Sequence, residues 1–145
     1  MAPSPESDPR SPTRAVRLRK ILVIDRDAFW GPAIRMALEE SGYYPNLVVD
    51  AREGCRRSME RVYDGVIVSA SLGQAAVWAI LDTLSRRTSP PAAVVLAGAD
   101  DPESEQNWAR VPCLWVLHRP YAVEDVVDAA RALVGVPWSD HRKGA

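Results

Sequence analysis

Short runs of apolar residues alternate with longer segments of mixed polarity along most of this chain. The runs lie at residues 21–24, 46–49, 66–68, 93–96 and 113–117. A strand that is covered on both faces of a sheet has a nearly continuous apolar sequence, whereas a half-exposed strand alternates between apolar and polar residues. The five runs therefore predict five buried strands.

The segments between these runs carry apolar residues at helical spacing. They predict helices over residues 33–41, 51–63, 74–86 and 123–134, with a short further helix over 102–110. Pro32 fits only the first turn of a helix, so the first helix begins near Trp30 or Gly31, and Gly42 ends it. In the second helix, the residues at the spacing of an inward stripe are Cys55, Met59 and Val62.

The alternation of strands and helices is typical of the α/β class. We expect a single doubly wound, five-stranded parallel sheet with helices on both faces, formed by residues 19–135. Residues 1–18 are rich in proline, serine and charge. They bury too little apolar surface to offset the entropy of ordering, which predicts a disordered tail. Residues 136–145 form a short C-terminal tail.

Composition narrows the classes of partner. The 145 residues have a formal net charge of -1, with 47% hydrophobic and 26% charged residues. A chain with so small a net charge has no strong positive electrostatic potential that would favour binding to nucleic acid or to an anionic membrane. No apolar stretch approaches the ~20 residues of a membrane-spanning helix, and the N-terminus lacks the apolar segment of a signal peptide. We expect a cytoplasmic protein without a nucleic-acid or membrane partner.

Neither cysteines nor histidines form a metal-binding pattern. Cys55 and Cys113 lie far apart and outside any C-x-x-C pair, so we expect two reduced thiols and no zinc site. His118 has only His141, in the C-terminal tail, as a second histidine.

In a doubly wound sheet, ligand sites lie at the carboxyl ends of the strands. Those ends carry polar residues in this sequence. They are Asp25, Arg26 and Asp27 after the first strand, Ser69 and Ser71 after the third, Ala97 and Gly98 after the fourth, and His118, Arg119 and Tyr121 after the fifth.

The order and spacing of these residues resemble the receiver domain of bacterial response regulators, over residues 19–134. The resemblance is carried by ILVIDRD at 21–27, by YDGVIV at 63–68, by a fourth strand that follows proline, and by a basic residue, proline and an aromatic at 119–121. It implies a flavodoxin-like fold, a role in signal transduction, and partners such as a kinase or an output protein.

The resemblance also implies a phosphorylation pocket, but several of its positions carry other residues here. The phosphoacceptor aspartate corresponds to Ser69. The two acidic residues that hold Mg²⁺ correspond to Asp25 and Arg26, while Asp27 lies one place beyond. The hydroxyl residue after the fourth strand corresponds to Ala97, and the lysine after the fifth corresponds to Arg119.

These replacements remove two negative charges and add a positive one. Phosphoryl transfer depends on a metal and on positioned charges around the transferring group. We therefore expect no aspartyl phosphorylation, no catalytic residue and no cofactor, with Mg²⁺ bound weakly or not at all. We also expect Arg26 or Arg119 to pair with Asp25. The predicted function is a degenerate, stand-alone receiver that works as a protein–protein interaction module.

Other uses of the pocket stay open at this stage. Arg26, Arg119 and the serine hydroxyls form a second candidate site, for a small anion or metabolite. A third interpretation is a small hydrolase or transferase in which Ser69 is the nucleophile and His118 the base, although the G-x-S-x-G motif is absent. Ser69 is also a candidate target for a Ser/Thr kinase.

A candidate interface lies on another face. In receivers, the fourth helix, fifth strand and last helix commonly mediate dimerisation or partner docking, and tryptophan and arginine are favoured interface anchors. The matching residues here are Trp108, Arg110, Tyr121, Val123 and Val127. The aromatic that receivers carry before the lysine corresponds to Val116, with Trp115 facing the other way. We expect a signalling partner or a homodimer at this face.

Overall fold

The computed structural model describes residues 16–60, 62–99, 114–136 and 138–140. Five strands form one parallel sheet in the order β3-β2-β4-β5-β6. They are β2 (Lys20–Ile24), β3 (Tyr44–Val48), β4 (Gly65–Ser69), β5 (Ala92–Ala97) and β6 (Leu114–His118). The predicted five-stranded parallel sheet is confirmed, and each strand lies within two residues of its predicted position.

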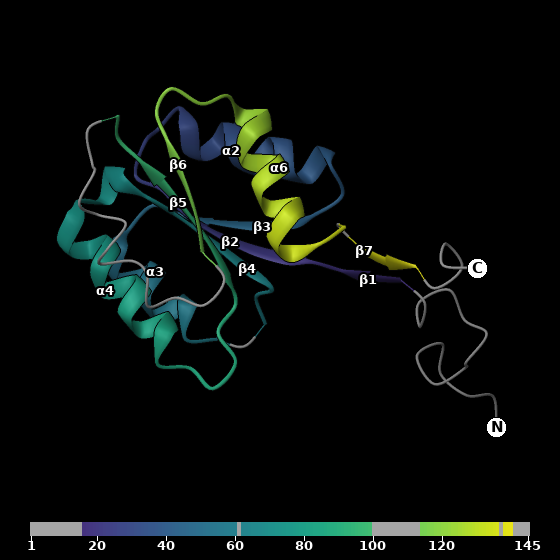
Figure 1. The fold of residues 1–145 in the computed structure, drawn as a ribbon, viewed down its shortest axis with the longest axis horizontal. Helices are drawn as coiled ribbons and strands as arrows, with labels where there is room; N and C mark the ends of the chain where they lie inside the picture. Colours follow the sequence, from purple (N-terminus) through teal and green to yellow (C-terminus); the bar gives the residue numbers. More distant parts are fainter. Residues whose placement is uncertain (1–15, 61, 100–113, 137, 141–145) are drawn as a thin grey trace.

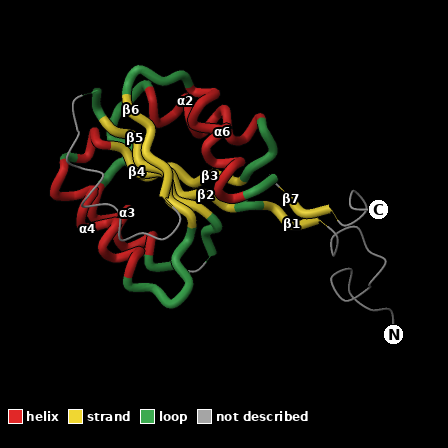
Figure 2. Tube along the Cα trace, viewed as in Figure 1, coloured by secondary structure: helices red, strands yellow, loops and turns green. Residues whose placement is uncertain are grey.

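Helices cover both faces of this sheet (Figures 1 and 2). Helices α2 (Trp30–Glu40) and α6 (Val123–Val134) pack on one face, and α3 (Ala51–Ser58) and α4 (Gln74–Ser85) on the other. A short 3₁₀ helix, η1 (Ala70–Leu72), follows β4. None of the helices in the described residues is long and apolar enough to cross a membrane.

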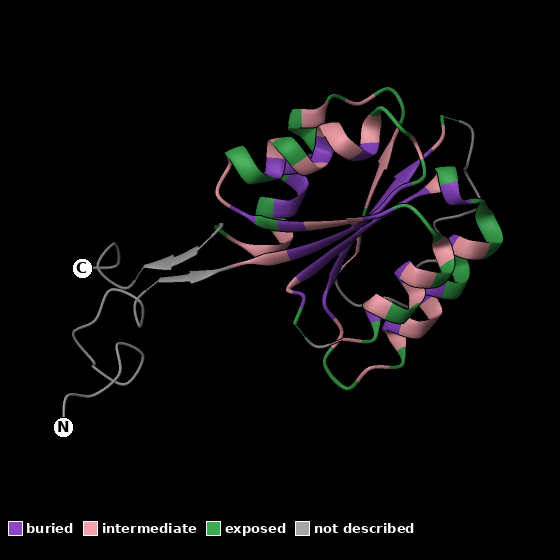
Figure 3. Ribbon diagram, turned by 180° about the vertical axis from the view of Figure 1, so that it is seen from behind, coloured by how far each residue is buried: buried purple, intermediate pink, exposed green. Residues whose placement is uncertain are grey.

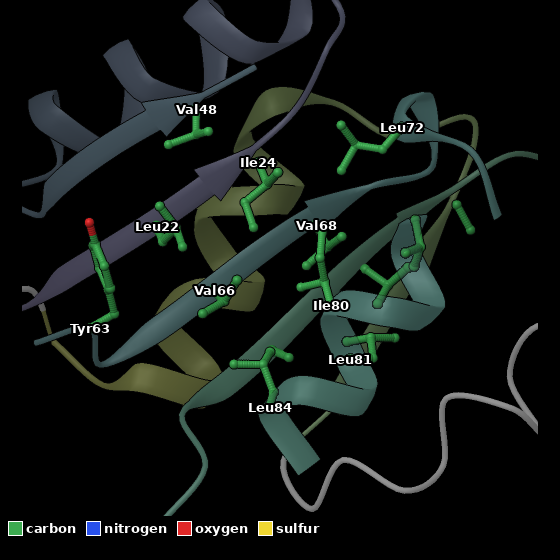
Figure 4. Packing of buried hydrophobic residues seen from close by; sticks show 14 residues of the cluster. Leu22, Ile24, Val48, Tyr63, Val66, Val68, Leu72, Ile80, Leu81 and Leu84 are labelled. Carbon is green, nitrogen blue, oxygen red and sulfur yellow. The ribbon is translucent and has the colours of Figure 1, made fainter. Parts of the chain in front are cut away.

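The core has two layers because side chains alternate between the two faces of a strand. Ile21 and Val23 of β2 point toward α2 and α6 and are 1% and 0% exposed. Leu22 and Ile24 point the other way, into the cluster under α3 and α4 that Figure 4 shows. Burial of the central strands is nearly complete (Figure 3). This explains why β4 and β5 have apolar sequences without alternation.

Helix α2 begins where the sequence predicted. The carboxylate of Asp27 accepts hydrogen bonds from the backbone N–H groups of Phe29 and Trp30, over 2.8 and 2.9 Å. It thereby satisfies donors that the first turn leaves without intrahelical partners. After the helix, Gly42 has a φ of 96°, a left-handed conformation that glycine adopts without strain.

Helix α3 is shorter than predicted. It ends at Ser58 rather than residue 63, and the Ser58 hydroxyl donates to the Cys55 carbonyl over 2.7 Å. The predicted inward stripe is therefore wrong for Met59 and Val62, which are 63% and 50% exposed. The helix instead packs through Gly54, where an added Cβ would lie 2.5 Å from Cγ2 of Ile24. Only glycine permits this close approach of α3 to β2.

The chain ends differ from the expected tails. Strand β1 (Val16–Leu18) pairs antiparallel with β7 (Trp138–Asp140), so that Arg17 lies opposite Ser139. The two strands form a ribbon that extends from the sheet beyond the start of β2 (Figure 1). Both predicted tail boundaries therefore move outward, because backbone pairing between distant segments leaves no trace in local composition. Residues 1–15, 137 and 141–145 of the tails, the predicted helix at 102–110 and Cys113 lie outside the described residues.

Candidate functional site

Asp25 is the centre of the residues that meet at the carboxyl ends of the strands. It follows β2 and is only 1% exposed. Its Oδ1 accepts hydrogen bonds from the backbone N–H of Asp27, over 2.9 Å, and from the hydroxyl of Ser71, over 2.8 Å. The Ser71 hydroxyl in turn accepts from the backbone N–H of Arg26, over 3.0 Å. These bonds join the β2–α2 loop to η1.

The second carboxylate oxygen of Asp25 has a different environment. Oδ2 is buried and has no hydrogen-bond partner in the described part of the protein. A buried acceptor without a partner has lost its contacts with water and gained nothing in exchange, which costs about 1–3 kcal/mol. The pocket therefore contains a destabilising polar atom at its centre.

Ser69, the residue that the sequence resemblance aligns with the phosphoacceptor, is the last residue of β4. It is 5% exposed, and its Oγ accepts a hydrogen bond from the backbone N–H of Ser71 over 3.1 Å. This bond caps the first turn of η1. The hydroxyl thus has a local structural role in the β4–η1 connection.

The expected ion pair between Asp25 and an arginine is wrong. Neither Arg26 nor Arg119 forms a salt bridge with Asp25 within the described residues. The guanidinium of Arg119 lies over the rings of Trp30 and Tyr121, at 5.3 and 5.4 Å from their centroids. Arginine over an aromatic face keeps much of its contact with water, whereas pairing with a buried carboxylate would require its desolvation.

Trp30 and Tyr121 form an aromatic pair beneath Arg119, with centroids 5.2 Å apart. Phe29 adds an edge-on contact to Trp30 at 5.6 Å. Burial raises the pKa of the Tyr121 hydroxyl, while the nearby Arg119 charge opposes this shift. The cluster joins the start of α2 to the β6–α6 loop.

The carboxylate of Asp27 is bound to the start of α2. The backbone hydrogen bonds from Trp30 and Phe29 lower its pKa, and Arg119 contributes in the same direction. Its carboxylate is therefore held in the charged form as the cap of α2 rather than directed at Ser69.

The donor set does not fit the Mg²⁺ ion that the receiver fold implies. Mg²⁺ requires near-octahedral oxygen ligands and is usually held by one or two carboxylates. Here Asp25 supplies a single carboxylate, and its Oδ1 already accepts two hydrogen bonds. No group of three or more His, Cys, Asp or Glu residues that could hold a metal exists among the described residues.

Ser69 and His118 are not arranged as a nucleophile and its base. They lie on β4 and β6, which are separated by β5, and neighbouring strands are about 4.8 Å apart. The Nδ1 of His118 lies 3.2 Å from the carbonyl oxygen of Gly98. Ala97, opposite His118 in the register, is 1% exposed and offers no hydroxyl. The geometry does not favour the hydrolase interpretation.

The candidate interface residues separate into three groups. Trp108 and Arg110 lie outside the described residues. Tyr121 and Val123 are half-buried near the start of α6. Val127 is 7% exposed and packs in the core beneath α6, so its assignment to a surface is wrong. The helical spacing of apolar residues predicted α6, but it did not determine on which side of the helix Val127 lies relative to the sheet.

Sequence reasoning missed two features of this site. It gave Ser71 no role with Asp25, and it did not group Phe29 and Trp30 with Arg119. The available signals were the hydroxyl two residues after Ser69 and the aromatic pair at the start of a helix. Neither signal is specific, because each contact depends on how two separate loops fold back over the sheet.

Comparison with solved structures identifies the fold. The chain is similar to the chemotaxis response regulator CheY4 of Vibrio cholerae, with a TM-score of 0.70 and 16% identity over 81% of this chain and 99% of that one. It is also similar to a response-regulator receiver domain from Clostridium thermocellum, with a TM-score of 0.72 and 24% identity over 88% and 98%. No protein-family model and no curated protein matches the sequence.

A third similar structure comes from a family of streptococcal redox sensors that evolved from two-component response regulators. Its TM-score is 0.69 and its identity 17%, over 80% of this chain and 51% of that one. The protein thus has the fold of response-regulator receiver domains.

Proposed function

We propose that this protein is a receiver-derived signalling module that acts by binding other proteins, without phosphorylation of an aspartate. The observation that carries this proposal is the hydroxyl of Ser69 at the end of β4, where it caps η1. A serine hydroxyl lacks the negative charge of the carboxylate nucleophile that phosphoryl transfer from an acyl phosphate needs. The proposed partners are a kinase or an output protein of a cytoplasmic signalling pathway.

Charge around the pocket supports the same proposal. Asp25 is the remaining acidic residue at the positions of the receiver metal site, and Arg26 and Arg119 are cationic. A transferring phosphoryl group requires a metal or equivalent charges held in place around it. Arg119 is instead stacked on Trp30 and Tyr121. The streptococcal redox sensors offer a precedent for a receiver-derived protein with a different task.

The geometry favours this function over the anion-binding alternative. The hydroxyls of Ser69 and Ser71 already take part in hydrogen bonds within the protein. The buried polar atom that lacks a partner is a carboxylate oxygen, Asp25 Oδ2, which would repel an anion. An anion would therefore meet an acceptor where it needs a donor.

Intact mass spectrometry after incubation with acetyl phosphate and Mg²⁺ tests the proposal. The expected result is no gain of a phosphate. The matched control carries Arg26→Asp, Ser69→Asp, Ala97→Thr and Arg119→Lys, which together restore the residues of a receiver pocket. An acyl phosphate on Asp25 or Asp27 in the unmodified protein would overturn the proposal.

A further inference from the structure

Helix α2 presents an apolar stripe to solvent. Gly31, Ile34 and Leu38 are buried and define its inner side. At about 100° per residue, Phe29, Ala33 and Met36 fall on the opposite side. Phe29 is 70% exposed and Met36 is 54% exposed. Phe29 and Met36 therefore mark a helix face that the described residues leave largely exposed, with the half-buried Ala33 between them.

The two ends of this stripe carry opposite charges. Arg26 precedes the helix and is exposed, and Arg119 lies over the ring of Trp30 at the same end. At the other end Glu40 is exposed and makes no ion pair within the described residues. Glu39 beside it pairs with Arg35 at 3.4 Å. The start of the stripe thus carries two arginines beside the capping carboxylate of Asp27, the middle is apolar and the end is acidic.

We propose that α2 packs antiparallel against α2 of a second copy of this chain, around a two-fold axis near Ala33. A helix rises about 1.5 Å per residue, so Phe29 and Met36 are about 10.5 Å apart along it. Centring the pair close to Ala33 sets Phe29 of each copy beside Met36 of the other. It also brings Glu40 of each copy to the end where the other carries Arg26 and Arg119.

Self-complementarity is the reason for assigning the face to a second copy. A two-fold contact uses the same patch on both chains, so every attractive contact occurs twice. Here one stripe supplies both partners of each contact, apolar against apolar and acidic against basic. Ala33 at the crossing is small enough for the two helices to approach closely. In an antiparallel pair the positive end of each helix dipole lies beside the negative end of the other, which is a favourable arrangement.

This inference is independent of the proposed function, since it depends neither on Ser69 nor on Asp25. It also uses a different face from the one predicted from sequence beside β6. A single pair of short helices buries less area than the ~1,200 Å² of a stable interface, so the association is weak and reversible.

Sedimentation velocity on the full chain, from about 10 μM to about 1 mM, measures this association. We expect the dimer fraction to rise with concentration and Phe29→Glu or Met36→Glu to weaken dimerisation more than tenfold. Met59→Glu is the matched control, since Met59 is 63% exposed on another face and its substitution leaves the dimer unchanged. Circular dichroism verifies that each variant is folded.

Charge exchange tests the geometry itself. Arg26→Glu and Glu40→Arg each place like charges together twice in their own dimer, and each weakens it about fivefold. An equimolar mixture of the two variants restores opposite charges at both ends and recovers the wild-type affinity as a heterodimer. A protein that stays monomeric at every concentration overturns the inference. This holds also if a different protein is found to bind the α2 face. A dimer that ignores the α2 variants, or a mixture that fails to recover, overturns it as well.

Discussion

The hydrogen bonds of Asp25 predict opposite effects for two substitutions at this position. Asp25→Ala removes Oδ1, the acceptor for the Asp27 N–H and the Ser71 hydroxyl. Loss of a buried acceptor costs about 1–3 kcal/mol, so we expect the free energy of unfolding to fall by about 2 kcal/mol. Asp25→Asn keeps that acceptor and replaces only the oxygen that has no partner.

Because Asn carries no formal charge into the buried site, we expect Asp25→Asn to be at least as stable as the wild type, by up to about 1 kcal/mol. Urea unfolding, followed by circular dichroism, measures all three proteins. Asp128→Ala is the surface control, because Asp128 is exposed and pairs with Arg131 at 3.4 Å. It is expected to change the stability by less than about 0.5 kcal/mol.

A single outcome refutes this reasoning. If Asp25→Asn loses as much stability as Asp25→Ala, then Oδ2 takes part in an interaction that needs its charge. Repeating the measurement with about 10 mM Mg²⁺ distinguishes a metal from other causes, because a ligand stabilises only the state that binds it. We expect Mg²⁺ to leave the unfolding midpoints of the wild type and of Asp25→Asn unchanged.

Three further predictions concern residues around the site. The pKa of Asp27 is lowered in the folded protein, so its contribution is present above the ordinary value of 3.8 and is lost as pH falls through the folded pKa. The urea midpoints of wild type and Asp27→Ala should therefore differ at neutral pH and converge as the pH falls through the lowered pKa; a constant difference contradicts the capping role. Gly54→Ala should destabilise by about 1–3 kcal/mol in thermal unfolding, because the new Cβ meets Ile24, and Ile24→Val should recover little of the loss, since valine keeps the γ-methyl group nearest to that Cβ. Arg119→Ala should lower the free energy of unfolding by about 1 kcal/mol through loss of its contacts with Trp30 and Tyr121, and an unchanged value would show that the stacking contributes nothing.

Much of the fold was predictable from local sequence. A strand buried on both faces needs apolar residues at nearly every position, so the continuous apolar runs of β4 and β5 were enough to predict these two strands. Because the strands are parallel, the residues that follow each strand lie at the same edge of the sheet. For this reason Asp25 and Ser69 were assigned to one pocket before any contact was known. The resemblance to receiver domains then implied a pocket without its acidic nucleophile, because serine occupies the corresponding position.

Only the tertiary structure decided how the residues of that pocket are connected. Arg119 had two kinds of partner within the same pocket, a buried carboxylate and an aromatic pair, and its guanidinium lies over the rings. The bond between Ser71 and Asp25 depends on the conformations of two loops that are 46 residues apart in sequence. The same holds for the pairing of β1 with β7. The local pattern of apolar residues shows which side of a segment must be buried. The residues that cover that side come from distant parts of the chain and are determined by long-range packing.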